Sequence, residues 1–139
     1  MEYGIETKCI HGDNDIVEGN SFGAVAVPIY QTATFSHPGI QQSTGFDYSR
    51  ESNPTRLELE KIVSSLEGAY DTIACSSGMA AIGLCLELFK DGDHIVCSED
   101  LYGGSVRIFE AIGETRGCGF SYVNTGDVEA VENSINEHT

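Results

Sequence analysis

The regular part of the chain begins near residue 54, where apolar positions start to recur every three or four residues. This period predicts an amphipathic helix whose apolar face is formed by Leu59, Ile62, Val63 and Leu66. The segment from Thr55 to Glu58 reads Thr-Arg-Leu-Glu, the pattern of a capping box, in which the hydroxyl and the carboxylate bond first-turn amides. Gly68 follows the last apolar position and is a typical helix stop. We therefore expect a capped helix that ends at Gly68.

From residue 70 onward, short apolar runs alternate with helical patterns. The runs that predict strands are Tyr70–Cys75, His94–Cys97 and Phe120–Val123. Helices are predicted after Ser76-Ser77-Gly78 (through Phe89), after Gly103-Gly104 (through Ile112), and after the capping residue Asp127 (through Ile135). This alternation predicts an α/β fold with a mainly parallel sheet covered by helices on both faces. Three strands leave an edge uncovered, so we expect a truncated sheet.

Residues 1–53 lack this periodicity and carry Gly, Ser, Asn and Pro throughout. Irregular stretches of such length are uncommon in a compact domain. We expect an extended arm with at most one short strand, at residues 24–27, that is either functional or packs on something outside the chain. The predicted organisation is thus an arm, 1–53, followed by a partial α/β domain, 54–139.

Composition narrows the function. The 139 residues include 22 acidic and 7 basic ones, for a formal charge of −15, which argues against binding to nucleic acid or to an anionic membrane. Five cysteines, an odd number without a Cys-x-x-Cys pair, argue against a disulfide framework and against a zinc site. No signal peptide is visible and no apolar run approaches the ~20 residues of a membrane span. These features predict a cytoplasmic globular protein.

The turn from Ser76 to Met79 is the first candidate for chemistry. It lies between a predicted strand and a helix, at the sheet edge where open α/β folds bind ligands. Free amides at a helix start attract anions, and Gly78 allows a phosphate to approach the backbone. The turn matches neither a Walker loop nor a dinucleotide fingerprint. Taken alone, it is better interpreted as an ordinary helix cap.

Two further clusters carry suitable side chains. Tyr48-Ser49-Arg50 offers a hydroxyl and a guanidinium, and the latter can bind a phosphate through two parallel hydrogen bonds. Tyr102 follows the second predicted strand, at the same end of the sheet as Ser77, where its ring could stack on a flat cofactor. In isolation, a surface arginine and a core tyrosine are the more common interpretations.

Together, the clusters resemble the Cys/Met-metabolism family of pyridoxal-phosphate enzymes, and the resemblance covers essentially the whole chain. This family includes cystathionine γ-synthase, cystathionine β- and γ-lyases, methionine γ-lyase and O-acetylhomoserine sulfhydrylase. The similar segments are residues 7–11, 27–35, 48–56, 77–81 and 100–105. The resemblance implies the amino-terminal part of the large domain of a fold-type-I (aspartate aminotransferase-like) enzyme.

The resemblance also implies roles for single residues around pyridoxal 5'-phosphate. The backbone amides of Gly78 and Met79 would bind the cofactor phosphate, with Ser77 beside them. Tyr102 would stack on the pyridine ring and act catalytically in proton transfer at the substrate amine.

Other residues would act across an interface between subunits. Tyr48 and Arg50 would reach the phosphate of the neighbouring subunit's cofactor, which gives the arm a function. Asn53 belongs to the same loop, and Arg107 would approach the substrate side.

The lysine that binds the cofactor covalently in such enzymes is not recognisable here. The lysines of the chain are Lys8, Lys61 and Lys90, and none stands in the family's Ser-x-x-Lys setting. The family's later aspartate and its carboxylate-binding arginine are also missing. We expect the amino-terminal portion of an enzyme, inactive alone; the alternative is a stand-alone dimerising or phosphate-binding module without catalysis.

The complete enzyme would be a homo-oligomer, a dimer of dimers, that acts on sulfur amino acids. Its substrates would be cystathionine, homocysteine, cysteine or activated homoserine esters. We favour elimination or replacement at Cγ, as in cystathionine γ-synthase or γ-lyase, over β-lyase, methionine γ-lyase and sulfhydrylase activity, although the amino-terminal motifs are shared by all of them.

Overall fold

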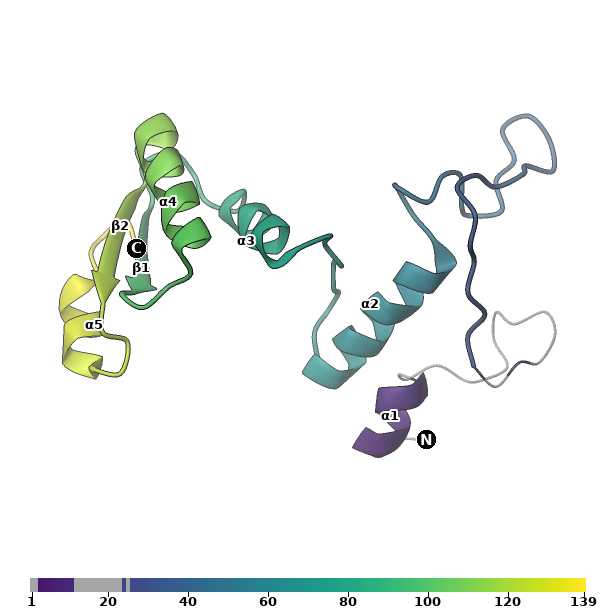
Figure 1. Ribbon diagram of the computed structural model, residues 1–139, viewed down its shortest axis with the longest axis horizontal. Helices are drawn as coiled ribbons and strands as arrows, with labels where there is room; N and C mark the ends of the chain where they lie inside the picture. Colours follow the sequence, from purple (N-terminus) through teal and green to yellow (C-terminus); the bar gives the residue numbers. More distant parts are fainter. Residues whose placement is uncertain (1–2, 12–23, 25) are drawn as a thin grey trace. The chain divides into compact units, whose positions relative to one another are not determined.

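The computed structural model describes residues 3–11, 24 and 26–139, and the chain divides into two compact units (Figure 1). The first unit is Met1–Ala74 and the second is Cys75–Thr139. The boundary expected from composition, between residues 53 and 54, remains a prediction about the complete fold. Within the described ranges, no helix is both long and apolar enough to cross a membrane.

The second unit contains a small parallel sheet. Strands β1 (His94–Ser98) and β2 (Gly119–Val123) pair in parallel, with His94 opposite Gly119 and Ser98 opposite Val123. Helix α4 (Gly103–Arg116) connects them and packs on β2, as does α5 (Val128–Ser134), while α3 (Gly78–Leu86) packs on α4. The predicted α/β order is confirmed for these elements.

The core of this unit lies between the sheet and helices α3 and α4. Its buried members are Leu86, Cys97 and Phe109, and the ring of Phe109 stacks on that of Phe120 with centroids 5.0 Å apart. Burial also raises the pKa of the Cys97 thiol, so this cysteine behaves as a small apolar side chain.

The predicted strand Tyr70–Cys75 is wrong for this structure. The segment is irregular, and the Ala74 N–H donates to Oε1 of Glu60 over 2.9 Å instead of to a neighbouring strand. A strand is stable only with a partner, and the described residues supply none for this apolar run. The predicted helices also end early: α3 stops at Leu86, before Phe89, and α5 at Ser134, with Ile135 as its extended C-cap.

The first unit packs α1 (Ile5–His11) against α2 (Pro54–Glu67). Helix α1 corrects the expectation of a wholly extended arm. Of the strand expected at residues 24–27, residues 24, 26 and 27 are not in a strand, and residue 25 lies outside the described part.

The capping box predicted at Thr55 is also wrong. Helix α2 begins two residues earlier, with Asn53 as N-cap and Pro54 as its first residue. The Asn53 side chain accepts a 2.9 Å hydrogen bond from the Thr55 N–H. The Thr55 hydroxyl instead accepts a bond from the Tyr30 N–H. The predicted stop is confirmed, since Gly68 adopts the left-handed conformation, with φ 61°.

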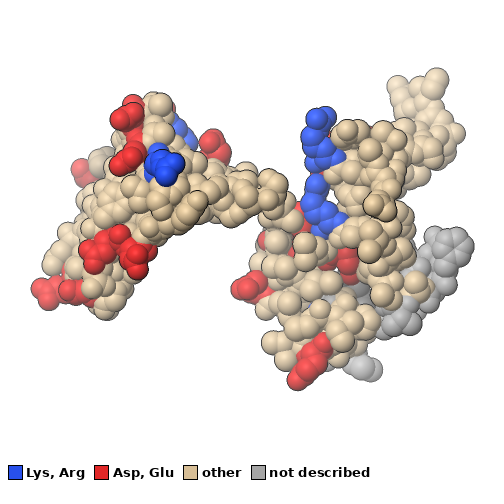
Figure 2. Space-filling view, viewed as in Figure 1, with Lys and Arg blue, Asp and Glu red and all other residues tan. Residues whose placement is uncertain are grey.

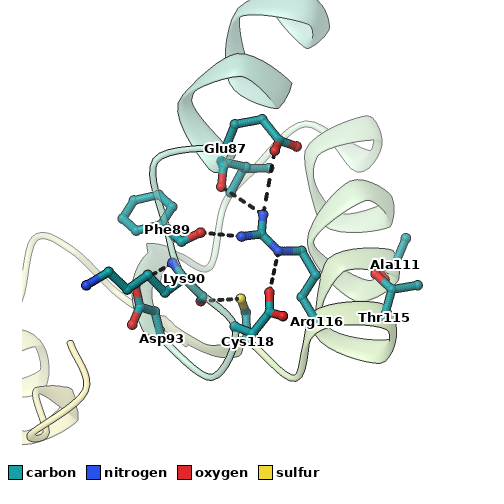
Figure 3. Close-up of polar contacts among 10 residues, drawn as sticks. Glu87, Phe89, Lys90, Asp93, Ala111, Thr115, Arg116 and Cys118 are labelled. Carbon is teal, nitrogen blue, oxygen red and sulfur yellow. Dashed lines mark hydrogen bonds and ion pairs between the residues drawn. The ribbon is translucent and has the colours of Figure 1, made fainter.

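Arg116, the last residue of α4, ties this helix to the end of α3 (Figure 3). Its guanidinium donates to the carbonyls of Leu86 and Phe89 and, over 2.9 Å, to the Asp91 carboxylate. The hydrogen bond to Asp91 raises the pKa of Arg116 further. A single fork-shaped cation thus satisfies backbone acceptors that the end of α3 leaves without intrahelical partners.

We expect Arg116→Ala to lower the melting temperature of the chain, because two carbonyls and one carboxylate lose their shared donor. Arg116→Lys should restore only part of the loss, since an ammonium cannot reproduce the planar fork. Thermal unfolding followed by circular dichroism measures both. Arg107→Ala is the matched control, because Arg107 is exposed on the same helix; equal melting temperatures for the two alanine variants would contradict the role of Arg116.

Candidate functional site

The first turn of α3 presents unpaired donors. Ser77 is extended, with φ −161° and ψ 160°, and its hydroxyl accepts a hydrogen bond from the Ala80 N–H over 3.1 Å. Within the described part of the chain, the amides of Gly78 and Met79 have no hydrogen-bond partner. A Cβ placed on Gly78 would meet nothing within 4 Å, so the approach to these amides is open. The turn therefore has the geometry of an anion site at a helix start.

The first turn of α4 lies beside this turn. A Cβ built on Gly104 would stand 3.2 Å from the Met79 sulfur and 2.5 Å from the Tyr102 ring. The Ser105 hydroxyl, only 4% exposed, donates a weak bond to the same sulfur at 3.9 Å. The structure thus brings Tyr102 to the turn of α3, and the Tyr102 ring, 74% exposed, has a face available for a ligand.

The predicted donors of the arm form their own pair in the first unit. The Arg50 guanidinium carbon lies 5.1 Å from the centre of the Tyr48 ring, a cation–π contact. Tyr48 forms an antiparallel bridge with Thr34, and the Ser49 N–H donates to the Ala33 carbonyl over 2.9 Å. The pair therefore sits on one limb of a hairpin rather than on a loose loop.

Two side chains fix this hairpin to α2. The Asn53 amide group donates to the Tyr30 carbonyl over 3.1 Å and to the Ser49 hydroxyl over 2.8 Å. Arg56, in the first turn of α2, donates to the carbonyls of Ser49, Arg50 and Glu51. Asn53, which the sequence placed only in an inter-subunit loop, is thus also the structural link between hairpin and helix.

The remaining predicted residue, Arg107, is exposed on α4. Tyr48 and Arg50 belong to one unit, and Ser77, Gly78, Met79 and Tyr102 to the other. Three contacts were not predicted from the sequence: the hydrogen bonds of Arg56 to the hairpin, the bond of Ser105 to Met79, and the close approach of Tyr102 to Gly104. Gly104 was a usable signal, since a glycine within a helix is unfavourable unless its neighbours need the space.

The second unit, which carries the candidate site, has more acidic than basic side chains. Figure 2 shows Asp and Glu side chains spread over the second unit, where basic side chains are few. An anion at α3 must therefore be held by local donors, that is, by amides and hydroxyls, and not by the overall field of a chain of charge −15.

Lys90 lies away from these donors. It follows the end of α3, where its backbone N–H donates to Asp93 over 2.8 Å and its carbonyl accepts from the Cys118 thiol. A nine-residue helix separates it from Ser77, about 13 Å at 1.5 Å per residue. Lys8 and Lys61 belong to α1 and α2 of the other unit.

The described residues fit one end of pyridoxal phosphate. Two free amides, a helix dipole and the Ser77 hydroxyl suit a phosphate, and the exposed Tyr102 ring suits an aromatic ring. The second unit has one lysine, Lys90, and it follows the end of α3 that is opposite to Ser77.

Comparison with known proteins identifies the family of the chain. Residues 6–139 match the model of the family described as Cys/Met metabolism PLP-dependent enzyme. The chain belongs to this family, whose members use pyridoxal phosphate.

Relatives with different activities are similarly close. The chain is 38% identical to a probable cystathionine gamma-synthase of Herpetosiphon aurantiacus, over 100% of its own length and 43% of that protein. It is 42% identical to cystathionine gamma-lyase of Bacillus subtilis, over 96% of its length and 35% of the relative. The chain thus spans less than half of the length of these curated relatives.

Solved structures agree on the fold. The metB protein of Corynebacterium glutamicum superposes with a TM-score of 0.85 at 35% identity, covering 99% of this chain and 36% of that one. Cystathionine gamma-lyase of Lactobacillus plantarum, solved with L-serine, gives a TM-score of 0.81 at 39% identity, covering 99% and 35%. The fold class is therefore that of the amino-terminal part of these enzymes, an α/β arrangement with a parallel sheet.

We expect Ser77→Ala to destabilise the second unit by about 0.5–2 kcal/mol, the usual effect of removing an N-cap hydroxyl. Ser76→Ala is the matched control, because the Ser76 side chain makes no hydrogen bond in the described structure. Urea unfolding followed by circular dichroism would measure both variants. Similar unfolding free energies for the two would show that the Ser77 hydroxyl does not cap α3.

Proposed function

We propose that the chain is the cofactor-phosphate-binding portion of a pyridoxal-phosphate enzyme that acts at Cγ of sulfur amino acids, as cystathionine γ-synthase and γ-lyase do. The single observation that carries the proposal is the placement of the unpaired Gly78 and Met79 amides beside the exposed Tyr102 ring. Family membership supports the choice of cofactor. The relative from Xanthomonas oryzae, a cystathionine gamma synthase solved with cystathionine, supports the class of substrate.

In this proposal, each residue has a defined task. The amides of Gly78 and Met79 donate to the phosphate, and the Ser77 hydroxyl lies beside them and fixes the turn. When bound, pyridoxal phosphate supplies an electron sink for carbanions of the amino-acid substrate. The Tyr102 ring would cover one face of the cofactor and exclude water from it, and its hydroxyl would take part in proton transfer at the substrate amine.

The arm has an inter-subunit task in the same proposal. Tyr48 and Arg50 donate to the phosphate of a neighbouring subunit's cofactor, which requires at least a homodimer and is consistent with a dimer of dimers. The hairpin bonds of Asn53 and Arg56 support this task, because they hold both donors on one rigid limb. Arg107 faces the substrate side. The enzyme acts in the cytoplasm.

Catalysis requires a lysine, and the second unit, which carries the candidate site, contains a single lysine, Lys90. Lys90 is at the far end of α3, which supports the proposal that the 139 residues alone bind but do not turn over a substrate. Which reaction the complete enzyme catalyses, whether at Cγ, by β-elimination or by sulfhydrylation, is determined by residues of the substrate pocket, and the amino-terminal motifs are common to all of these reactions.

The test is borohydride reduction of the chain with pyridoxal phosphate, followed by mass spectrometry and an assay with cystathionine and with homocysteine. We expect reversible binding, no stoichiometric lysine adduct and no turnover. Pyridoxal, which lacks the phosphate, is the matched control ligand and should bind more weakly. A coding sequence that continues past Thr139 with a Ser-x-x-Lys motif should yield a protein with a single adduct on that lysine and with turnover.

Two results would contradict the proposal. A stoichiometric adduct on Lys8, Lys61 or Lys90 together with turnover would refute inactivity of the chain alone. Equal binding of pyridoxal and its phosphate, by the chain and by any longer protein, would contradict binding of the cofactor phosphate by the amides of Gly78 and Met79.

A further inference from the structure

The two glycines that open α4 have different surroundings. A Cβ on Gly103 would meet nothing within 4 Å. A Cβ on Gly104 would lie 2.5 Å from Cε1 and 3.0 Å from Cδ1 of Tyr102, and 3.2 Å from Sδ of Met79. Neither glycine has a positive φ, so the backbone does not require glycine at either position. At residue 104 a side chain is therefore disfavoured by the positions of Tyr102 and Met79 and not by the backbone conformation.

The two neighbours of Gly104 differ in their freedom to move. Met79 belongs to the helical first turn of α3, and its sulfur accepts the 3.9 Å bond from the Ser105 hydroxyl, which is 4% exposed. The Tyr102 ring is 74% exposed and makes no side-chain capping bond. A methyl group on residue 104 would therefore displace the ring outward and leave Met79 and its amide in place.

We infer that Gly104 is a positioning residue: its missing side chain lets the Tyr102 ring lie against Met79, next to the phosphate-binding turn. The inference rests on the proposed function, since the ligand that the ring would cover is the cofactor. Gly104 would act on the ring contact alone, while the anion site at Gly78 and Met79 depends on α3. A change at residue 104 should therefore separate binding of the ring from binding of the phosphate.

Gly104→Ala and Gly103→Ala form a matched pair. Both add one methyl group to the first turn of the same helix and have the same intrinsic effect on helix formation. Only Gly104→Ala meets Tyr102 and Met79. Any difference between the two variants reports on the space beside Gly104 rather than on the loss of a glycine.

The experiment uses the full chain, with NMR to follow the nuclear Overhauser contact between the Met79 methyl and the Tyr102 ring. Titrations with inorganic phosphate and with pyridoxal phosphate follow the amide signals of Gly78 and Met79. We expect the contact in the wild type and in Gly103→Ala, and its loss in Gly104→Ala. The dissociation constant of pyridoxal phosphate should rise about threefold to tenfold in Gly104→Ala, the size of one aromatic contact, while that of inorganic phosphate stays unchanged.

Tyr102→Ala provides a second, independent measurement. If Gly104 acts through the ring, then Gly104→Ala should have no further effect on pyridoxal-phosphate affinity once the ring is removed. An additional loss of affinity in the double variant would overturn the inference, because residue 104 would then act through another contact.

Other outcomes are equally decisive. Three results would overturn the inference. The Met79–Tyr102 contact could persist in Gly104→Ala, or it could be lost in both glycine variants. Gly104→Ala could also lose affinity for pyridoxal phosphate and for inorganic phosphate to the same extent. A fourth outcome separates the two proposals. If the contact is lost in Gly104→Ala alone, the positioning of the ring is supported. If the wild-type chain also binds pyridoxal phosphate no better than inorganic phosphate, the proposed function is contradicted.

Discussion

The second unit depends on the attachment of α3 to α4 along its whole length. At one end, Met79 contacts the first turn of α4; in the middle, Gly83 faces Ile108; at the other end, Arg116 bonds the carbonyls that close α3. The two helices therefore run in the same direction, and both amino termini come to one side. The buried core between them explains why nine residues of α3 remain helical, although a helix so short is marginal by itself.

This arrangement also determines what the site can bind. Two helix starts at one place bring free amides and the positive ends of two dipoles together in an otherwise acidic chain. The attraction is short-ranged, because it comes from partial charges on the backbone and not from lysine or arginine side chains. As proposed, such a site would favour a small anion that can approach the backbone closely, while the acidic surface would still repel polyanions.

Local signals in the sequence predicted the second unit well. Periodicity located β1, β2, α4 and α5, and the αL glycine after α2 was recognised from its position. The strand Tyr70–Cys75 failed because its apolar residues need a partner strand that the described chain lacks. Thr55 failed as a cap because Asn53-Pro54 gives a stronger start and because the Thr55 hydroxyl is used by Tyr30, a contact between residues 25 positions apart. For the candidate site, the resemblance supplied the residues that we propose, whereas the packing of Gly104, Ser105 and Met79 required three-dimensional structure.

The side-chain amide of Asn53 restricts which residues can replace it. A helix cap alone would treat asparagine and aspartate as nearly equivalent, since both offer an oxygen to the first-turn amides. Here the nitrogen of the same group also donates to Tyr30 and Ser49, two acceptors or potential acceptors on the hairpin. A carboxylate at residue 53 would still accept the capping hydrogen bond. Its second oxygen, however, would stand where the NH₂ group now donates to the Tyr30 carbonyl and the Ser49 hydroxyl, and it has no proton to give to either. One isosteric exchange of NH₂ for O⁻ would thus leave α2 intact while it releases the limb that carries Tyr48 and Arg50.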